Sequence, residues 1–383
     1  YGFVRDAPAP DTVNPSLWRQ CQLLGITGLF EVVDGIYQVR NVDLAVMTFI
    51  RGQTGWIVVD PLVTAAPAAE ALRLVREHVA DLPVSAVLST HSHADHFGGI
   101  EGVADRADVE AGRVRYVVPA GFVEESVSEY VRAGNVMARR ASYVCGSAVP
   151  PGPEGGGGAG LGPSSGTGSM ALYPPTDIVD HTGQALDIDG VRFVFQHTPG
   201  AEAPAEYCFY LPEHAALCMA EIASHTLHNV YTLRGAKMRD ALTWSKHIHE
   251  ALRLFGDRAQ VLFASHHWPT WGNEALRAQL VGQRDLYRFL HDQTLRLANH
   301  GYGPTEIASH TLHNVYTLRG AKMRDALTWS KHIHEALRLF GDRAQVLFAS
   351  HHWPTWGHEA LRAQLVGQRD LYRYLHDQTL RLA

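Results

Sequence analysis

The chain has 383 residues, of which 46% are hydrophobic and 19% charged, and its formal net charge is -6. This composition is typical of a soluble globular protein and excludes a wholly disordered or fibrous chain. The 33 basic residues form no cluster, so nucleic acid is not expected as a partner, and no apolar run approaches the roughly 20 residues of a membrane span.

The chain alternates predicted strands and helices. Apolar runs predict the strands, and an amphipathic pattern over 66–79 predicts a helix between two of them. A strand, a helix and a further strand at this spacing are typical of an α/β fold. The predicted strands are 36–39, 44–50, 56–59, 84–88, 116–118, 191–195, 207–211, 215–220 and 261–264, and the further predicted helices are 122–139, 240–255 and 274–297.

Residues 150–170 are rich in proline, glycine and serine and contain four consecutive glycines at 155–158. Such a composition predicts a loop. Nucleotide binding by this loop is disfavoured, because no Gly-Lys-Ser/Thr follows it and no strand leads into it. We expect a mobile loop at the surface or at the rim of an active site.

The four cysteines, Cys21, Cys145, Cys208 and Cys218, show no Cys-x-x-Cys spacing. A chain of this size needs no disulfide scaffold, and a zinc–thiolate site is not predicted. The sequence begins at Tyr1 without an initiator methionine or an apolar leader, so we expect the natural N-terminus to lie upstream.

One long segment occurs twice. Residues 221–298 recur as residues 306–383 with two differences over 78 positions. The differing pairs are Asn273 with His358 and Phe289 with Tyr374. Removing 78 from 383 leaves 305 non-redundant residues, which suit one large domain and the start of another. Such near-identity indicates a recent duplication or a false join at the shared Glu-Ile-Ala, since old repeats diverge.

Histidine is frequent, with 23 in the chain, and three of them fall in one short segment. The predicted strand 84–88 leads into His91, His93, Asp95 and His96. A surface histidine cluster is the alternative, but it would not require four donors between a buried strand and a Gly-Gly pair. Binding a divalent metal ion offsets the energetic cost of burying such polar side chains. A single ion that keeps one coordination position open binds about three protein ligands, so four ligands exceed its need. The motif therefore predicts two metal ions.

The His-x-His-x-Asp-His motif resembles that of the metallo-β-lactamase superfamily and, within it, of the alkyl sulfatases that hydrolyse long-chain alkyl sulfates. The supporting strings are 90–99, 198–206, 227–229 with 232–235, and 265–272. The resemblance covers most of residues 1–305. It implies an α/β fold of the αββα sandwich type, with a di-metal site at one sheet edge and a C-terminal helical extension. The near-identical partial repeat that follows is a departure from the family.

The resemblance also implies the ligands of two zinc ions. The first ion would bind His91, His93 and Glu202, the second Asp95, His96 and His266, with Glu221 bridging. Glu206 is the rival of Glu202, which is favoured because it follows the Pro-Gly turn. Asp60, at the end of predicted strand 56–59, is either a residue that orients a ligand histidine or a turn residue.

A sulfate monoester requires cations, and a guanidinium group presents a planar fork of donors to its oxygens. The resemblance assigns Asn229, Arg234 and Arg239 to the sulfate pocket. The alternative is that both arginines make structural salt bridges with acids such as Asp240. The string 268–271, with two tryptophans, is equally compatible with the wall of an apolar channel for an alkyl tail and with core packing.

The implied reaction is zinc-dependent hydrolysis of an alkyl sulfate ester to alcohol and sulfate by a hydroxide that the two metals activate. Attack on sulfur and attack on the ester carbon both stay open. The alternatives are another hydrolase of the superfamily, acting on an ester, lactone, thioester or β-lactam, and a truncated or duplicated product without activity. The sequence does not decide the compartment, which is the bacterial cytoplasm, the periplasm or the outside of the cell.

The resulting domain prediction is a catalytic domain over 1–272, the start of a helical, dimerisation-type region over 273–305, and the partial copy over 306–383. A homodimer follows as an expectation from the resemblance. The second copy brings no second histidine motif, so only one di-metal site is expected. We expect the first copy to take the place in the sheet, because its connecting loop is shorter.

Overall fold

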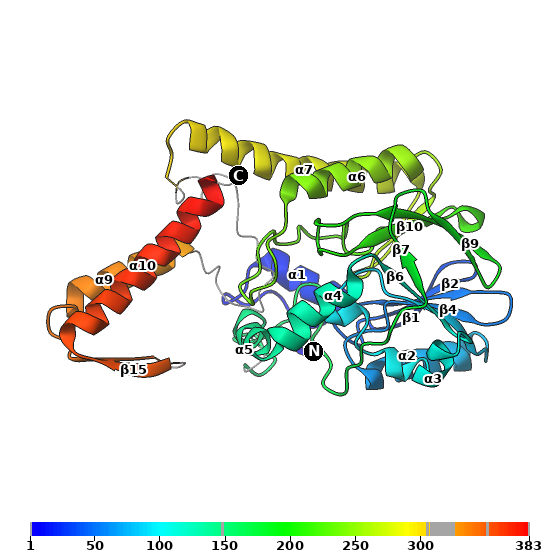
Figure 1. The fold of residues 1–383 in the computed structure, drawn as a ribbon, viewed down its shortest axis with the longest axis horizontal. Coiled ribbons are helices and arrows are strands. Elements are labelled where there is room, and N and C mark those ends of the chain that lie inside the picture. The colour runs from blue at the N-terminus through cyan, green and yellow to red at the C-terminus, as the bar shows by residue number, and fades with distance from the viewer. Residues whose placement is uncertain (1, 147–148, 304–305, 307–325, 350–351, 382–383) are drawn as a thin grey trace. The chain divides into compact units, whose positions relative to one another are not determined.

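The protein is described by a computed structural model that covers residues 2–146, 149–303, 306, 326–349 and 352–381 (Figure 1). These residues divide into two compact units, the first ending at Tyr287 and the second comprising the described residues from Arg288 onward. Among the described residues, no helix is both long enough and apolar enough to cross a membrane.

The first unit contains two sheets. The seven-stranded sheet follows the chain order, and its strands are antiparallel from β1 to β4 and parallel from β4 to β7. Its strands are β1 (Gly28–Val33), β2 (Ile36–Arg40), β3 (Met47–Arg51), β4 (Trp56–Val59), β5 (Val84–Leu88), β6 (Arg115–Pro119) and β7 (Asp177–Val179). The six-stranded sheet has the order β13-β12-β11-β10-β9-β8. Its strands are β8 (Ala185–Ile188), β9 (Val191–His197), β10 (Tyr207–Leu211), β11 (Ala216–Cys218), β12 (Val261–Phe263) and β13 (Thr270–Trp271).

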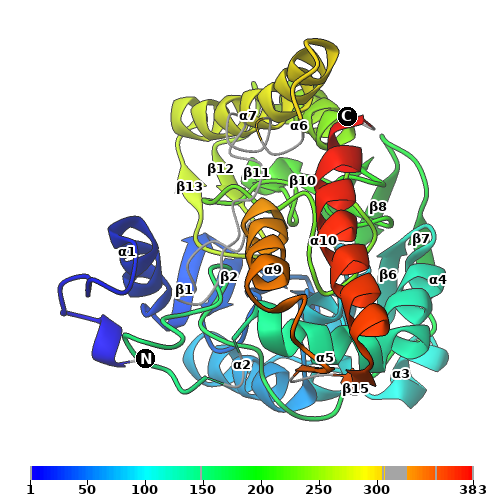
Figure 2. The ribbon, with the colours of Figure 1, turned by 90° about the vertical axis from the view of Figure 1, so that its left-hand side faces the viewer.

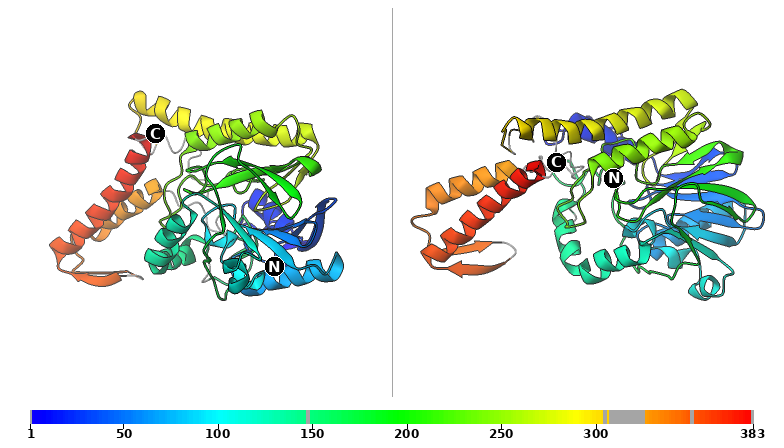
Figure 3. Two further views of the ribbon diagram at one scale, coloured as in Figure 1. Left: turned by 45° about the vertical axis from the view of Figure 1, so that its right-hand side comes forward. Right: turned by 45° about the horizontal axis from the view of Figure 1, so that its top comes forward.

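Helices cover the outer faces of both sheets. In Figures 1 and 3, α2 and α3 lie on the outer side of the first sheet and α6 on the outer side of the second. The α-helices that begin in this unit are α1 (Pro15–Leu24), α2 (Ala65–His78), α3 (Arg106–Glu110), α4 (Phe122–Ser126), α5 (Gly134–Val144), α6 (Ala241–Phe255) and α7 (Asn273–Asn299). Short 3₁₀-helices span Gly2–Val4, Ala94–His96, Ile100–Gly102 and Pro212–His214.

The strand β4 shows how the sequence produces two hydrophobic cores. Successive side chains of a strand point to opposite faces, so an apolar strand can serve two layers at once. Trp56 and Val58 belong to the core that contains Leu72 of α2. Ile57 and Val59 belong to the core between the sheets, which contains Phe193, Phe195 and Phe209. The predicted αββα sandwich is confirmed.

Three predicted strands are shorter in the structure, and the one predicted over 261–264 ends one residue early, at Phe263. The strand predicted over 44–50 begins at Met47, because the N–H of Val46 turns away and donates to the carbonyl of Ser265 at 2.7 Å. The strand predicted over 215–220 reduces to β11, since Ala215 and Ala220 both have φ of 47°, in the left-handed region that ends a strand.

The helix predicted over 122–139 is interrupted, whereas the other predicted helices are correct to within two residues at each end. Between α4 and α5 the chain forms a π-helical segment, Val127–Arg132. Such segments are rare and concentrate at functional sites, and apolar periodicity does not reveal them. This one carries Glu129, which reaches the site described below.

The second unit repeats local structure of the first. Its elements are α9 (Ala326–Phe340), β14 (Val346–Ala349), β15 (His352–Trp356) and α10 (His358–Arg381). The elements α9, β14 and α10 begin 85 residues after α6, β12 and α7, the offset of the sequence repeat. Figure 2 shows α9 and α10 side by side. In the first unit, β12 occupies the place beside β11, as expected for the first copy.

Candidate metal centre

The centre forms where loops leave the ends of strands in both sheets. The loop after β5, which carries the histidine motif, pairs with the segment before β10: the N–H of Ser92 donates to the carbonyl of Ala205 at 3.2 Å, and His91 forms an isolated bridge with Glu206. In the second sheet, the N–H of Ser265 donates to the carbonyl of Ala220 at 2.8 Å. This contact brings the residues that follow β11 and β12 together.

Seven predicted ligands converge there in two groups. The first group is His91, His93, Glu202 and Glu221, and the second is Asp95, His96, Glu221 and His266. Within each group the candidate ligand atoms all lie within 4.8 Å of one another. Glu221 is common to both groups, which is the position of a bridging carboxylate.

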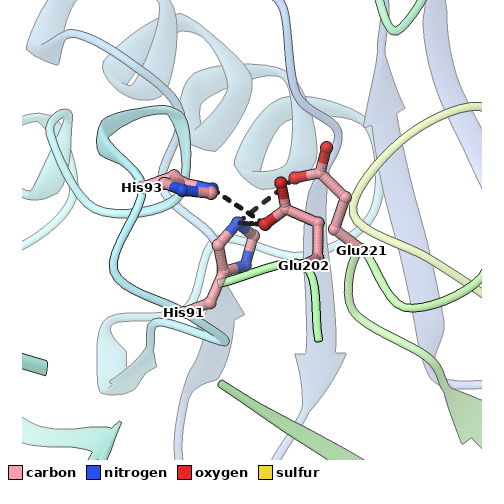
Figure 4. Close-up of side chains that lie close together, drawn as sticks. All are labelled: His91, His93, Glu202 and Glu221. Carbon is pink, nitrogen blue, oxygen red and sulfur yellow. Dashed lines mark ion pairs between the residues drawn. The ribbon is translucent and has the colours of Figure 1, made fainter. Parts of the chain in front are cut away.

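The contacts of the first group are short and buried. His93 Nδ1 lies 2.8 Å from Glu202 Oε2, and His91 Nε2 lies 3.2 Å from Glu221 Oε2 (Figure 4). His91 Nε2 is also 3.5 Å from Glu202 Oε2. Two imidazoles and two carboxylates that face one point form a donor set suited to a divalent ion such as zinc.

The second group has a similar geometry. Glu221 Oε2 lies 3.3 Å from His96 Nε2 and 3.2 Å from His266 Nε2. Asp95 Oδ2 lies 3.2 Å from the same nitrogen of His96 and 3.6 Å from that of His266. One oxygen of Glu221 thus faces His91, His96 and His266 together.

The outer nitrogens of these rings have partners, whereas the inner ones do not. Nδ1 of His96 pairs with Asp60 at 3.1 Å, Nδ1 of His266 with the carbonyl of Leu44 at 3.1 Å, and Nδ1 of His91 with the hydroxyl of Thr90 at 3.0 Å. The Nε2 atoms of all three rings and Oε2 of Glu202 are buried and, although they face one another across the short contacts given above, they make no hydrogen bond of suitable geometry. Buried polar atoms are seldom left unsatisfied, so these residues fit a metal centre.

The pKa shifts of the ligand histidines point in two directions. Burial lowers the pKa of His91, which favours the neutral imidazole that binds metals. By contrast, Asp95 and Asp60 outweigh burial and raise the pKa of His96, and Glu221 does the same for His266.

Burial alone would raise the carboxyl pKa values, but His96 holds the pKa of Asp95 below its usual range, and Arg239 does the same for Glu202. His266 and neighbouring histidines lower the pKa of Glu221. These shifts favour the ionised carboxylates that bind metals.

Asp60 ties three segments together beneath the centre. It is buried, has φ of 57°, and accepts hydrogen bonds from the N–H of Thr90 at 2.8 Å and from the hydroxyl of Ser265 at 2.6 Å. It also pairs with His96. Of the two sequence interpretations, these contacts favour the residue that orients a ligand histidine.

Glu206 lies outside both groups. Its Oε2 accepts from the N–H groups of Glu202 at 3.3 Å and Ala203 at 3.2 Å, and its Oε1 accepts from the N–H of Glu221 at 3.4 Å. Burial and the charge of Glu202 raise the pKa of Glu206 well above its usual range. This side chain holds the backbone that carries the two candidate ligand glutamates.

The residues assigned to a sulfate pocket lie beside the first group. Arg239 is buried, donates through Nε to the carbonyl of Glu202 at 2.7 Å, and forms an ion pair with the carboxylate of Glu202. It also donates to Oδ1 of Asn229 at 2.7 Å. Arg234 pairs with Glu129 at 2.7 Å. The arginines do form salt bridges, but Asp240 is not their partner, since its side chain caps α6 through the N–H groups of Leu242 and Thr243.

Two side chains reach the centre that the sequence interpretation did not assign to it. His228 Nε2 lies 3.0 Å from Glu221 Oε1 and 3.7 Å from Glu202 Oε1. Glu129 Oε2 lies 3.8 Å from His93 Nε2. His228 could have been found from the sequence, because it directly precedes Asn229 in one of the strings that support the resemblance. No feature of the sequence indicates that Glu129 reaches the centre.

The glycine-rich segment packs close to the centre. The carbonyl of Gly160 pairs with Nε2 of His267 at 2.9 Å, and the N–H of Gly166 donates to Asp43 at 2.6 Å. His267 directly follows His266, so the segment lies at the rim rather than on a remote surface. Trp268, next along the chain, stacks on His225 with ring centroids 4.6 Å apart.

The chain is similar to several known proteins. The family model described as the Metallo-beta-lactamase superfamily matches residues 40–266. The linear primary-alkylsulfatase of Pseudomonas sp is 55% identical over 309 residues, which make up 80% of this chain and 46% of that protein. The alkyl/aryl-sulfatase BDS1 of Saccharomyces cerevisiae is 46% identical over 308 residues, 80% of this chain and 48% of that protein.

Among solved structures, the stereoselective inverting sec-alkylsulfatase Pisa1 from Pseudomonas sp. has a TM-score of 0.81 and 34% identity, covering 97% of this chain and 67% of that one. The chain spans about half the length of the curated relatives it matches. The resemblance predicted from the sequence motifs is confirmed.

Proposed function

The chain belongs to the metallo-β-lactamase superfamily, and from this premise we propose that it hydrolyses alkyl sulfate esters to an alcohol and sulfate at a centre of two zinc ions. The similarity to alkylsulfatases supports the substrate class. The observation that carries the proposal is the convergence of four imidazoles and two further carboxylates on Glu221, with buried imidazole nitrogens that make no hydrogen bond.

The proposed ligands are those of the two groups. His91, His93 and Glu202 would hold one ion, Asp95, His96 and His266 the other, and Glu221 would bridge them. When bound, the ions would supply Lewis-acid activation of water and of the ester.

The chain's own residues would position these ligands and the substrate. Asp60 orients His96 through its Nδ1, and Arg239 orients Glu202 through its carboxylate and its carbonyl. We assign the sulfate oxygens to Arg234 and Asn229, because a guanidinium group beside the first group supplies the charge that a sulfate monoester requires. Arg239 adds positive charge there, and each arginine is already paired with a carboxylate, Arg234 with Glu129 and Arg239 with Glu202.

The experiment is sulfate release from decyl or dodecyl sulfate by the purified chain. We expect activity that a chelator abolishes and zinc restores, and the absence of metal-dependent sulfate release would refute the proposal. The repeat offers a matched control. His266→Ala should remove activity and zinc, whereas His351→Ala, which alters the counterpart outside the described residues, should leave both intact.

A second candidate is another hydrolase of the superfamily that acts on a carbonyl substrate. Arg234→Ala separates the two, because a carbonyl ester has no need of a sulfate-binding cation. Arg239→Ala would not separate them, since Arg239 contacts Glu202 and its loss would disturb the centre for any substrate. An ester hydrolysis that survives Arg234→Ala, without sulfate release, would favour the second candidate.

A further inference from the structure

Glu129 lies on a short segment that is held against the histidine motif at two points. The hydroxyl of the buried Ser126, at the end of α4, donates to the carbonyl of Ser92 at 3.2 Å. Tyr130 packs against Phe97, which directly follows the motif, in a T-shaped contact with ring centroids 5.9 Å apart. These contacts flank Glu129 and fix its backbone beside the first group of candidate ligands.

Glu129 holds Arg234 by one side of its guanidinium group. Nε and Nη2 of Arg234 both donate to Oε1 of Glu129, at 3.2 and 2.7 Å, whereas Nη1 makes no hydrogen bond to a described residue. The two side chains are 24% and 11% exposed, so solvent screens their interaction less than that of a surface pair. Arg234 therefore keeps a donor for an anion although its charge is already balanced.

The other arginine assigned to the sulfate pocket is balanced in the same way. Arg239 forms an ion pair with Glu202, and its side chain is only 3% exposed. Each guanidinium group thus has one carboxylate partner, and the two arginines supply hydrogen-bond donors with little surplus positive charge. A tetrahedral anion with one negative charge suits such a pocket, whereas an anion with two negative charges requires more positive charge to offset its loss of hydration.

We propose that Glu129 is a specificity-determining residue, which makes the pocket select a singly charged sulfate ester over a doubly charged phosphate ester. This inference rests on the proposed function, since it concerns the substrate of the same site. The carboxylate of Glu129 balances the charge of Arg234 and holds its guanidinium group in place. Removing that negative charge while keeping the shape of the side chain should favour the doubly charged anion.

The test is the binding of octylsulfonate and octylphosphonate to the zinc-loaded chain, measured by calorimetry at about pH 9. The two ligands share a tail and a tetrahedral head group, carry one and nearly two negative charges, and lack the ester bond that would be hydrolysed. For Glu129→Gln we expect the ratio of the two dissociation constants to shift by about 5- to 10-fold in favour of the phosphonate. Glu129→Asp retains the charge and should shift this ratio by less than about twofold.

Glu125→Gln is the matched control. Glu125 lies one turn before Glu129 and pairs with Lys237 of the same loop at 2.6 Å, but Lys237 is 60% exposed, so solvent screens the charge. This variant should leave the ratio unchanged. Arg234→Gln leaves the carboxylate of Glu129 unpaired and should shift the ratio in the opposite direction, in favour of the sulfonate.

An unchanged ratio in Glu129→Gln would overturn the proposal, and so would an equal shift in Glu125→Gln or in Glu129→Asp. If Glu129→Gln does not fold or loses zinc, Arg234→Gln decides, and a ratio that does not move in favour of the sulfonate overturns the proposal. Binding is measured without turnover. Absence of sulfate release would refute the proposed function, whereas an unchanged ratio would refute the role of Glu129 alone.

Discussion

Nδ1 of His96 lies 3.1 Å from Oδ2 of Asp60, and both side chains are buried beneath the candidate metal centre. Burial alone would raise the pKa of Asp60, but His96 and His91 hold it below its usual range, so the carboxylate is ionised. An ionised acceptor keeps the proton of His96 on Nδ1 and turns Nε2 toward the ligands.

Replacing this carboxylate should weaken metal binding without removing a ligand. For Asp60→Asn we expect zinc affinity and kcat to fall by about 10- to 100-fold, the usual effect of losing a partner that orients a metal-bound histidine. Zinc per chain, measured by mass spectrometry after dialysis against a weak chelator, checks the first effect. Asp34→Asn, in the exposed turn between β1 and β2, is the control. Full zinc content in Asp60→Asn would show that the Asp60–His96 contact is dispensable.

The rival glutamates make a second pair of variants. Glu202→Gln removes a carboxylate from the first group, so we expect zinc content to fall by about half. Glu206→Gln should retain both ions, because Glu206 lies outside both groups and its raised pKa already favours the neutral form that glutamine resembles. Equal zinc loss in the two variants would contradict the assignment of Glu202 as the ligand.

Sequence reasoning succeeded where the signal is local. The strands β5 and β10 have the predicted bounds, because each is a continuous apolar run between turn residues. The histidine motif is equally local, since three histidines and one aspartate fall within six positions. β1 and β8 were not predicted, because Glu31 and Asp187 interrupt their apolar residues and neither strand is a continuous apolar run.

The contacts that organise the centre could not be read from the sequence in the same way. The hydrogen bond between Ser265 and Asp60 joins residues 205 apart, and that between Arg234 and Glu129 joins residues 105 apart. A single sequence contains no signal for such pairs. The repeat further limits what the sequence can predict, because two nearly identical segments have the same local preferences for helix and strand. Only the pairing of β12 with β11 in the folded structure shows that the first copy joins the sheet.

Arg239 offers a test of geometry at constant charge. Its guanidinium contacts the carbonyl and carboxylate of Glu202 and the side chain of Asn229, and one ammonium group cannot reach all three. We expect Arg239→Lys to lower kcat by about 10-fold or more and to reduce the free energy of unfolding by about 1 to 3 kcal/mol, because a buried acceptor loses its donor. Arg253→Lys on the exposed side of α6 is the control. An unchanged kcat would mean that charge alone suffices at this position.

The cysteines test the burial of the core in solution. Burial raises the pKa of Cys21 to about 11, and it raises the pKa of the buried Cys208 and Cys218 further. Because the thiolate is the reactive form, these three thiols should react slowly in the folded protein. Cys145 is half-buried, so we expect one fast-reacting thiol in the native chain at pH 8 and four in denaturant. Cys145→Ser should remove the fast phase and leave three slow thiols. Fast labelling of Cys218 would contradict the packing of β11 against the first sheet, and fast labelling of Cys208 would contradict the burial of the other face of β10.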